Sequence, residues 1–411
     1  MNISKKAITR LLSSASAAAT MSAAAADLPV VSGVTISQDA STRLVTVGYT
    51  LSGTNAIVTV DFLTNGVSIG GANIHHVVGD VNAVVEPGQR SIYWQPRRSW
   101  PGQTVANALT ARVTAWSESS PPDYLVADLA NGSLAYYETA DFLPDGGLTN
   151  DIYRTERIVM RRIHASGETY WEGSPTTESG RSSNETRRQV SFTNDFYLGV
   201  FELTMGQMSQ VDSKWASDNG RALDRSKWVN PASPVFLAAQ DGYNGLCHST
   251  TTYPSSHTVE SGSQLDLMRK RFGGKCQLDI PTSAQWEFAC RAGTTTAFYW
   301  GDDASVFGDY GWYKGNANSS AHRVGEKLPN AWGLYDMLGN VLEATQDRWV
   351  SSRSSDAVID PVTSASTSDT EKRGGHWVEA NTSSCRCATR IQYGNKAYGG
   401  AQGVRLSIPI K

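Results

Sequence analysis

Apolar and polar side chains alternate along the first quarter of the chain. The alternation is clearest over residues 45–51, 58–62 and 109–115, and a period of two is typical of half-buried antiparallel strands. Turn signals separate these segments, at Asn65-Gly66, Pro87-Gly88 and Pro101-Gly102. The pattern predicts a small all-β sandwich of immunoglobulin or fibronectin type over residues 27–118.

The pattern changes after this segment. Residues 119–155 are rich in turn-forming residues, and we interpret them as a linker and connecting segment. From residue 156 onward, short apolar stretches alternate with Gly, Asn, Pro and Trp. One of the few convincing helices is predicted there, with Thr282 as its N-cap and Gly293 as its stop. These features predict an α+β domain with little regular secondary structure, held together by buried aromatic side chains.

Composition narrows the functional classes. The chain has 411 residues, which predicts two or three domains, and 40% of them are hydrophobic, which is enough for more than one core. Its 36 basic and 39 acidic residues give a formal net charge of −3, so the sequence predicts no nucleic-acid partner. The 37 Gly and 12 Trp fit turns and aromatic-filled irregular cores better than helical bundles.

Residues 1–26 have the three parts of a secretory signal peptide. Basic residues come first, an Ala-, Ser- and Leu-rich run follows, and Ala24-Ala25-Ala26 ends the segment. The alternative is an Ala-rich helix of the mature protein. We expect export to the periplasm, the cell surface or the medium, and no transmembrane segment in the mature chain. Disulfides are permitted in such a compartment, where an odd count of five Cys leaves at least one thiol.

Four separated runs stand out in the remaining two thirds of the chain. They are Gly173-Ser174-Pro175 with Phe196-Tyr197-Leu198-Gly199; Ile280-Pro281-Thr282 continuing through Trp286-Glu287 to Cys290-Arg291-Ala292-Gly293; Gly333-Leu334-Tyr335-Asp336-Met337 with Gly339-Asn340-Val341; and Arg373-Gly374-Gly375 with Cys385-Arg386-Cys387 and Gly403-Val404-Arg405-Leu406. In this order they resemble the formylglycine-generating enzyme family, also called sulfatase-modifying-factor domains. The resemblance covers about residues 156–411 and implies a C-type-lectin-like core with long structured loops.

The third run also suggests a calcium site. Two carboxylates, Asp336 and Glu343, flank a turn, and Ca²⁺ prefers six to eight oxygen ligands that include backbone carbonyls. The resemblance implies a structural Ca²⁺ held by the side chains of Asp336 and Glu343 and by the carbonyls of Gly339 and Val341.

The resemblance raises a question about catalysis. The family's enzymes use O₂ to oxidise one Cys of a sulfatase to formylglycine, with Cu(I) held by two thiolates, and soft thiolates suit Cu(I). Glu379 and Ser384 stand where those two cysteines would be, and His376 replaces a usual Ser. We therefore favour a non-catalytic member that binds a peptide, protein or glycan. The cleft candidates are Arg373, His376, Glu379 and Arg390.

The cysteines leave an alternative open. Cys385 and Cys387 are two residues apart, and on a strand both thiols would point to the same side and could hold Cu(I). In that case the protein would be a formylglycine-generating oxidase with a sulfatase as its partner. The structural interpretation, which the resemblance implies, is a disulfide between Cys290 and Cys387. Cys247 and Cys276 could then form a second bridge.

Overall fold

The computed structural model describes most of the chain. The described residues are 28–102, 108–212, 234, 259, 261–364, 369–393 and 401–410. The expected signal peptide and Cys247 lie outside them. Within these ranges, no helix is long and apolar enough to cross a membrane.

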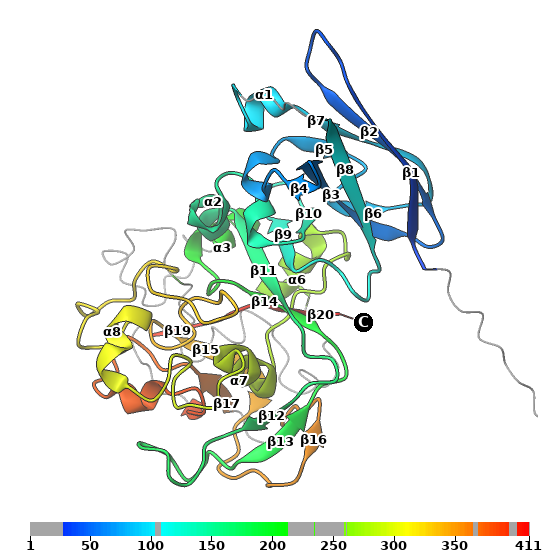
Figure 1. The fold of residues 1–411 in the computed structure, drawn as a ribbon. Helices are drawn as coiled ribbons and strands as arrows, with labels where there is room; N and C mark the ends of the chain where they lie inside the picture. Colours follow the sequence, from blue (N-terminus) through cyan, green and yellow to red (C-terminus); the bar gives the residue numbers. More distant parts are fainter. Residues whose placement is uncertain are drawn as a thin grey trace, which may run out of the picture.

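Two antiparallel sheets form the N-terminal part (Figure 1). Strand order in the first sheet is β1-β2-β7-β5, with β1 (Val30–Gln38), β2 (Val45–Ser52), β7 (Gly88–Trp94) and β5 (Val77–Gly79). The second has the order β4-β3-β6, with β8 also paired to β3; its strands are β4 (Val67–Ser68), β3 (Ala56–Thr64), β6 (Ala83–Val85) and β8 (Leu109–Trp116). A short helix, α1 (Pro96–Ser99), follows β7.

The alternating residues form the core between these two sheets. Val45, Val47, Tyr49 and Leu51 are all at most 1% exposed. The Phe62 ring stacks on Trp94 with 4.3 Å between ring centroids. The predicted all-β sandwich is therefore confirmed, because one face of each strand carries the residues that exclude water from the shared core.

A five-stranded sheet links the sandwich to the rest of the molecule. Its order is β10-β9-β11-β14-β20, with β10 (Ser133–Tyr137), β9 (Tyr124–Asp128), β11 (Arg157–Ile163), β14 (Phe196–Gly199) and β20 (Ser407–Pro409). The sheet therefore begins inside the segment interpreted as a linker. Strand β9 pairs in antiparallel register with β11, from Arg157 opposite Asp128 to Arg161 opposite Tyr124.

Two smaller sheets and short helices complete the domain. One sheet has the order β18-β17-β15-β19, with β18 (Ile391–Tyr393), β17 (Thr370–Arg373), β15 (Leu342–Arg348) and β19 (Gln402–Gly403). The other has the order β12-β13-β16, with β12 (Thr169–Glu172), β13 (Arg188–Ser191) and β16 (Val358–Ile359). The α-helices are α2 (Ile152–Thr155), α3 (Met205–Val211), α6 (Gln264–Arg271), α7 (Ser283–Arg291) and α8 (Phe307–Tyr310).

Helix α7 has the ends that its sequence predicts. The Thr282 hydroxyl accepts a hydrogen bond from the Gln285 amide, and Gln285 Oε1 accepts one from the Thr282 amide, which makes a capping box. Ala292 and Gly293 both have positive φ, of 47° and 91°, so the chain leaves the helix there. The predicted N-cap and stop are confirmed, and the α+β class with low regular content is confirmed with them.

The sandwich is fixed to the second domain through the outer face of β3. Ile57, Thr59 and Asp61 point away from the sandwich core, yet each is at most 2% exposed. The Thr59 hydroxyl donates to Glu138 Oε1 at 2.6 Å, and the Tyr136 amide donates to the Asn82 carbonyl at 2.9 Å. Strands β9 and β10 lie between the two halves of the molecule in Figure 1. The contacts through these strands hold the sandwich against the second domain.

Candidate functional site

The residues singled out in the sequence gather after strand β17. The chain leaves β17 at Arg373 and turns through Gly374 and Gly375, whose φ angles are 91° and 73°. A Cβ atom on Gly375 would lie 2.3 Å from the Cys385 sulfur, so only glycine allows this approach. A one-turn 3₁₀ helix, η6 (Thr382–Cys385), follows. The double glycine therefore folds residues 376–379 back against η6.

This turn brings together the two positions, 379 and 384, at which the resemblance implies copper-binding cysteines. Glu379 and Ser384 share a side-chain hydrogen bond, and the Glu379 side chain is 24% exposed. Glu379 Oε1 also lies 3.2 Å from His376 Nε2, while His376 Nδ1 accepts the Val378 amide hydrogen at 3.1 Å. At these two positions the chain carries a carboxylate and a hydroxyl, which are hard oxygen groups, rather than thiolates.

Burial sets the protonation of this cluster. It lowers the pKa of His376 to about 4, so the imidazole is neutral at pH 7. Since Nδ1 accepts a hydrogen bond, the proton sits on Nε2 and is donated to Glu379. Burial also raises the pKa of Glu379, and the Ser384 hydrogen bond opposes that rise. The partly exposed Glu379 carboxylate can hydrogen-bond a polar ligand at the surface. The side chains of His376, Glu379 and Ser384 include no sulfur that could bind a metal.

The geometry assumed for copper binding by Cys385 and Cys387 is wrong. The segment is not a strand: Cys385 is the last residue of η6, which Asn381 caps by accepting the Ser383 amide hydrogen at 3.0 Å. Both cysteines are fully buried, but the sulfur of Cys385 lies against Gly375, whereas that of Cys387 faces Cys290. Burial raises the pKa of the Cys385 thiol, so forming the thiolate that Cu(I) needs is costly.

The disulfide that the resemblance implies has its two partners in contact. The sulfurs of Cys290 and Cys387 are 3.6 Å apart and fully buried. A bonded pair would be about 2.05 Å apart, and all four cysteines of the described ranges are thiols in this structure. The Cys290 to Cys387 disulfide therefore stays a prediction, and Cys276 is buried elsewhere, in the core beside α6.

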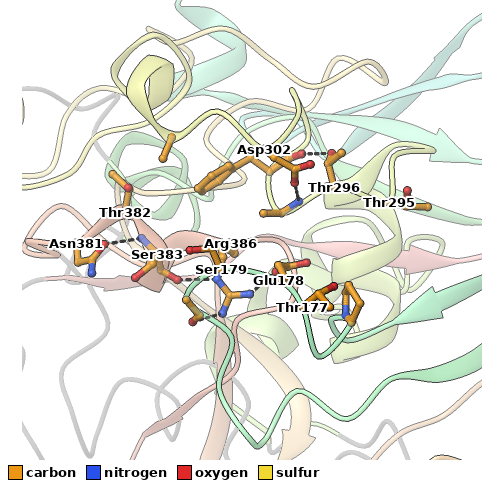
Figure 2. Close-up of a pocket in the computed structure, with 15 residues that line it drawn as sticks. Thr177, Glu178, Ser179, Thr295, Thr296, Asp302, Asn381, Thr382, Ser383 and Arg386 are labelled. Atoms are coloured by element: carbon orange, nitrogen blue, oxygen red, sulfur yellow. Dashed lines mark hydrogen bonds and ion pairs between the residues drawn. The ribbon is translucent and has the colours of Figure 1, made fainter.

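A cavity of about 670 Å³ opens beside η6. Its walls come from the loop at 175–180, the turn at 295–304 and η6, as Figure 2 shows. We call it the hydroxyl pocket after six of its lining residues, Thr177, Ser179, Thr295, Thr296, Thr382 and Ser383. The lining residues Asn381 to Ser383 precede Ser384 directly in the chain, whereas Ser384 and Glu379 themselves are not among the lining residues.

Arg386 holds the walls of the hydroxyl pocket together. Its guanidinium donates to the Gly180 carbonyl at 2.8 Å and to the Ser383 carbonyl at 2.9 Å. It also pairs with Glu185 and Glu178. The loop and η6 are therefore joined by charge-assisted hydrogen bonds around a side chain that is only 2% exposed.

The predicted calcium ligands lie in a buried acidic region. Asp336 is in the left-handed conformation at φ 56°, and its Oδ2 accepts the Gly325 amide hydrogen at 2.7 Å. Its Oδ1 is buried without a hydrogen-bond partner. Both oxygens of Glu343 are already used by Arg405, and one also accepts from Trp286 Nε1 at 2.7 Å. Glu343 is thus already engaged by Arg405 and Trp286, although its charge still acts on Asp336.

Glu202 is the residue that sequence reasoning missed. It is fully buried, and its oxygens accept from the Asn340 side chain at 2.7 Å and the Val341 amide at 3.2 Å. Burial and the nearby Asp336 charge raise the pKa of Glu202 well above its usual range, and burial raises that of Asp336 to about 6. No three His, Cys, Asp or Glu side chains cluster as a metal site in the described ranges. Backbone carbonyls would have to complete a Ca²⁺ shell.

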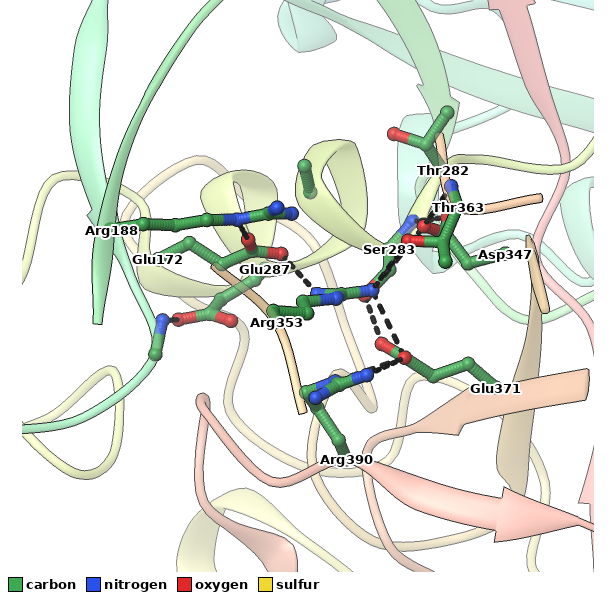
Figure 3. A network of polar contacts seen from close by, with 12 residues as sticks. Glu172, Arg188, Thr282, Ser283, Glu287, Asp347, Arg353, Thr363, Glu371 and Arg390 are labelled. Atoms are coloured by element: carbon green, nitrogen blue, oxygen red, sulfur yellow. Dashed lines mark hydrogen bonds and ion pairs between the residues drawn. The ribbon is translucent and has the colours of Figure 1, made fainter. Parts of the chain in front are cut away.

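The other two cleft candidates, Arg373 and Arg390, belong to a buried network of ion pairs rather than to a cleft. Figure 3 shows the part of this network around Arg353, Glu371 and Arg390. Arg373 is 0% exposed and donates to Glu287 at 2.9 Å, and Arg390 donates to Glu371 at 2.6 Å. Arg353 joins the two halves, with Nη1 2.8 Å from Glu172 and Nη2 3.0 Å from Glu371. The network crosslinks β12, α7, β17 and the loops around them.

The network makes stability depend on pH. Burial alone would raise the pKa of Glu371, but Arg353, Arg390 and Arg373 outweigh it and hold the pKa at about 2, against 4.5 for an ordinary Glu. The carboxylate therefore stabilises the fold fully above about pH 4.5, and this contribution of about 3 kcal/mol disappears as the pH falls to about 2.

We expect Glu371→Gln to lower the free energy of unfolding by about 3 kcal/mol at pH 7, because it leaves buried arginines uncompensated. The variant should also lose less stability than the wild type between pH 4.5 and pH 2. Urea denaturation followed by Trp fluorescence measures both effects. Glu168→Gln, at an exposed position, is the matched control and should change neither; equal pH profiles for all three proteins would contradict the role of Glu371.

Comparison with known proteins identifies the fold family. Residues 165–410 match the sulfatase-modifying factor enzyme 1-like domain. The chain is 32% identical to the formylglycine-generating enzyme of Bos taurus over 192 residues, which are 43% of this chain and 49% of the relative. It is 30% identical to the formylglycine-generating enzyme of Mus musculus over 128 residues, which are 28% of this chain and 34% of the relative.

The chain thus spans about half or less of the length of these relatives. Among solved structures, PvdO from Pseudomonas aeruginosa is similar with a TM-score of 0.48 and 19% identity, covering 61% of this chain and 94% of that chain. The family match covers more than half of the chain and includes α7, β15, β17 and η6. The chain belongs to the sulfatase-modifying-factor family, the family of formylglycine-generating enzymes.

Proposed function

We propose that this protein is an exported, ligand-binding member of the family that does not carry out copper-dependent oxidation of cysteine. One observation carries the proposal: Glu379 and Ser384, which stand where the resemblance implies the two copper cysteines, share a side-chain hydrogen bond. Export rests on the signal-peptide pattern of residues 1–26. The ligand, a peptide or a glycan, would enter the hydroxyl pocket beside these two residues.

The chemistry of the donor set supports this proposal. Cu(I) favours thiolates over carboxylate and hydroxyl oxygens, and Glu379 and Ser384 provide only oxygens. The nearest alternative sulfur, that of Cys385, is fully buried and lies against Gly375. The residues present therefore do not fit the family's copper ion.

The direct test is an oxidation assay. The reduced protein is incubated with Cu(I), O₂ and a sulfatase-motif peptide that contains Cys, and the peptide is examined by mass spectrometry for an aldehyde. We expect the peptide to remain unmodified, while the Bos taurus relative serves as the positive control. Aldehyde formation at a stoichiometric copper content would overturn the proposal.

Restoring the two cysteines should restore copper binding. Because Glu379 and Ser384 already touch, the double variant Glu379→Cys/Ser384→Cys places two thiols side by side at a partly exposed position. We expect it to retain a stoichiometric amount of Cu(I), measured as metal content after gel filtration. The matched control, Glu168→Cys/Ser354→Cys, carries two thiols at separate exposed positions and should retain none. Equal copper contents would show that the two positions do not form a pair.

We further propose that a structural Ca²⁺ binds between Asp336 and Glu202, completed by carbonyls that include those of Gly339 and Val341. Two features support it: the unpartnered Asp336 Oδ1 and the raised pKa values of both carboxyls. A bound divalent cation would neutralise this excess negative charge. Glu343, which pairs with Arg405, would add negative charge from a neighbouring position.

Calcium should then raise the melting temperature, and a chelator should lower it. Free Ca²⁺ at about 100 times the Kd of the site stabilises the folded protein by about 2.7 kcal/mol. Asp336→Asn and Glu202→Gln should each remove most of the Ca²⁺-dependent shift in a thermal melt, whereas Asp356→Asn, at an exposed position, should keep it. A wild-type melt that is the same with Ca²⁺ and with chelator would count against the site.

A further inference from the structure

We infer that the hydroxyl pocket binds an uncharged saccharide rather than a peptide side chain or an anion. The inference rests on the proposed binding function and names its ligand class. It depends on three properties of the pocket: free hydroxyl groups, the absence of a free cation, and walls that are already fixed.

The pocket offers several short polar side chains whose hydroxyls have no partner. Within the described part of the chain, the hydroxyls of Thr177, Ser179, Thr295, Thr382 and Ser383 make no hydrogen bond, although each can donate one and accept two. Sugar hydroxyls have the same dual capacity. A cavity of about 670 Å³ is also within the range of ordinary ligand sites.

Two further side chains add directional groups. Asp302 accepts the Ala297 amide hydrogen through Oδ1 at 2.9 Å, and its second oxygen remains available. Asn381 uses its Oδ1 to cap η6, and its amide NH₂ remains available. In Figure 2 Asn381 lies beside Thr382 and Ser383, whereas Asp302 lies beside Thr296. An acceptor and a donor placed around a set of hydroxyls can orient a neighbouring pair of sugar hydroxyls.

Charge argues against an anionic ligand. Arg386 is the one basic side chain among the described residues that line the pocket. Its guanidinium is already paired with Glu178 and Glu185 and is 2% exposed. A phosphate, sulfate or carboxylate would therefore enter beside Glu178 and Asp302 without a free cation to stabilise it.

The apolar residues of the pocket are few and mostly small. They are Pro175, Ala297, Ala304 and Phe298, and Phe298 is 3% exposed and stacks on Trp300 with 4.8 Å between ring centroids. Peptide hot spots are typically large aromatic or Arg side chains in well-packed pockets, and the lining here is instead dominated by short polar side chains. Small apolar surfaces of this kind suit the C–H faces of a sugar ring.

The walls are fixed before any ligand binds. Arg386 ties the 175–180 loop to η6, and the Cys387 amide donates to the Ala297 carbonyl at 2.8 Å, which ties η6 to the third wall. Little conformational entropy is then lost on binding. This matters for a saccharide, because its hydrogen bonds replace equally good bonds to water.

The test is saturation-transfer NMR on the full mature chain with maltose, cellobiose, lactose and N,N′-diacetylchitobiose as probes at millimolar concentration. We expect transfer to at least one of them. Thr295→Trp, at the exposed rim of the pocket, should weaken that binding by about tenfold or more, which is about 1.4 kcal/mol. Thr110→Trp, at an exposed position of β8, should leave it unchanged.

Three outcomes overturn the inference. Transfer to none of the four probes does so, and so does binding that Thr295→Trp leaves intact. The third outcome is that the protein binds the sulfatase-motif peptide but no saccharide, and that Thr295→Trp abolishes this peptide binding. The ligand class would then be a peptide, and the proposed binding function would still hold. Failure of the proposed function is seen separately, as aldehyde formation by the wild type.

Discussion

A buried network of arginines and carboxylates is the interaction on which the C-terminal domain depends. The domain has short strands and long loops, so backbone hydrogen bonds alone do not join its parts. Arg353 bridges Glu172 of β12 and Glu371 of β17, and Arg373 joins β17 to Glu287 of α7. Such charges are tolerated in the interior only when each has its partners. The network thus fixes the distances between the elements that carry the Gly374-Gly375 turn, η6 and the hydroxyl pocket.

The structural roles of the motif residues explain why family membership does not settle the function. Several residues that carry the resemblance hold the fold together: Trp286 donates to Glu343 at 2.7 Å, and the Gly173 amide donates to Glu287 at 2.9 Å. Arg405 donates to the Gly199 carbonyl at 2.8 Å. These contacts hold the fold together whether or not copper chemistry is present. Function therefore has to be argued from Glu379, Ser384 and the pocket beside them.

The sequence predicted the features whose determinants are local. The strands of the sandwich follow from alternation, and α7 follows from Thr282, Gln285 and Gly293, which lie within one short segment. The strand assumed for Cys385 and Cys387 failed because a cap by Asn381 and the close approach of Gly375 shape that segment.

The missed features depend on contacts between distant residues. Glu202 meets Asn340 across 138 positions. The strands β9 and β10 form an early part of a sheet whose partner, β11, lies beyond a turn-rich segment. The burial of Arg373 and Arg390 likewise depends on carboxylates from other elements. No local sequence pattern predicts these long-range contacts.

The central claim is that a carboxylate and a hydroxyl have replaced the copper thiolates on an otherwise intact family fold. X-ray absorption at the copper edge, on the reduced protein exposed to Cu(I), tests it most directly. The account predicts that any retained copper has oxygen or nitrogen neighbours and no shell of two sulfurs. A two-sulfur shell that disappears in the Cys385→Ser variant would contradict it.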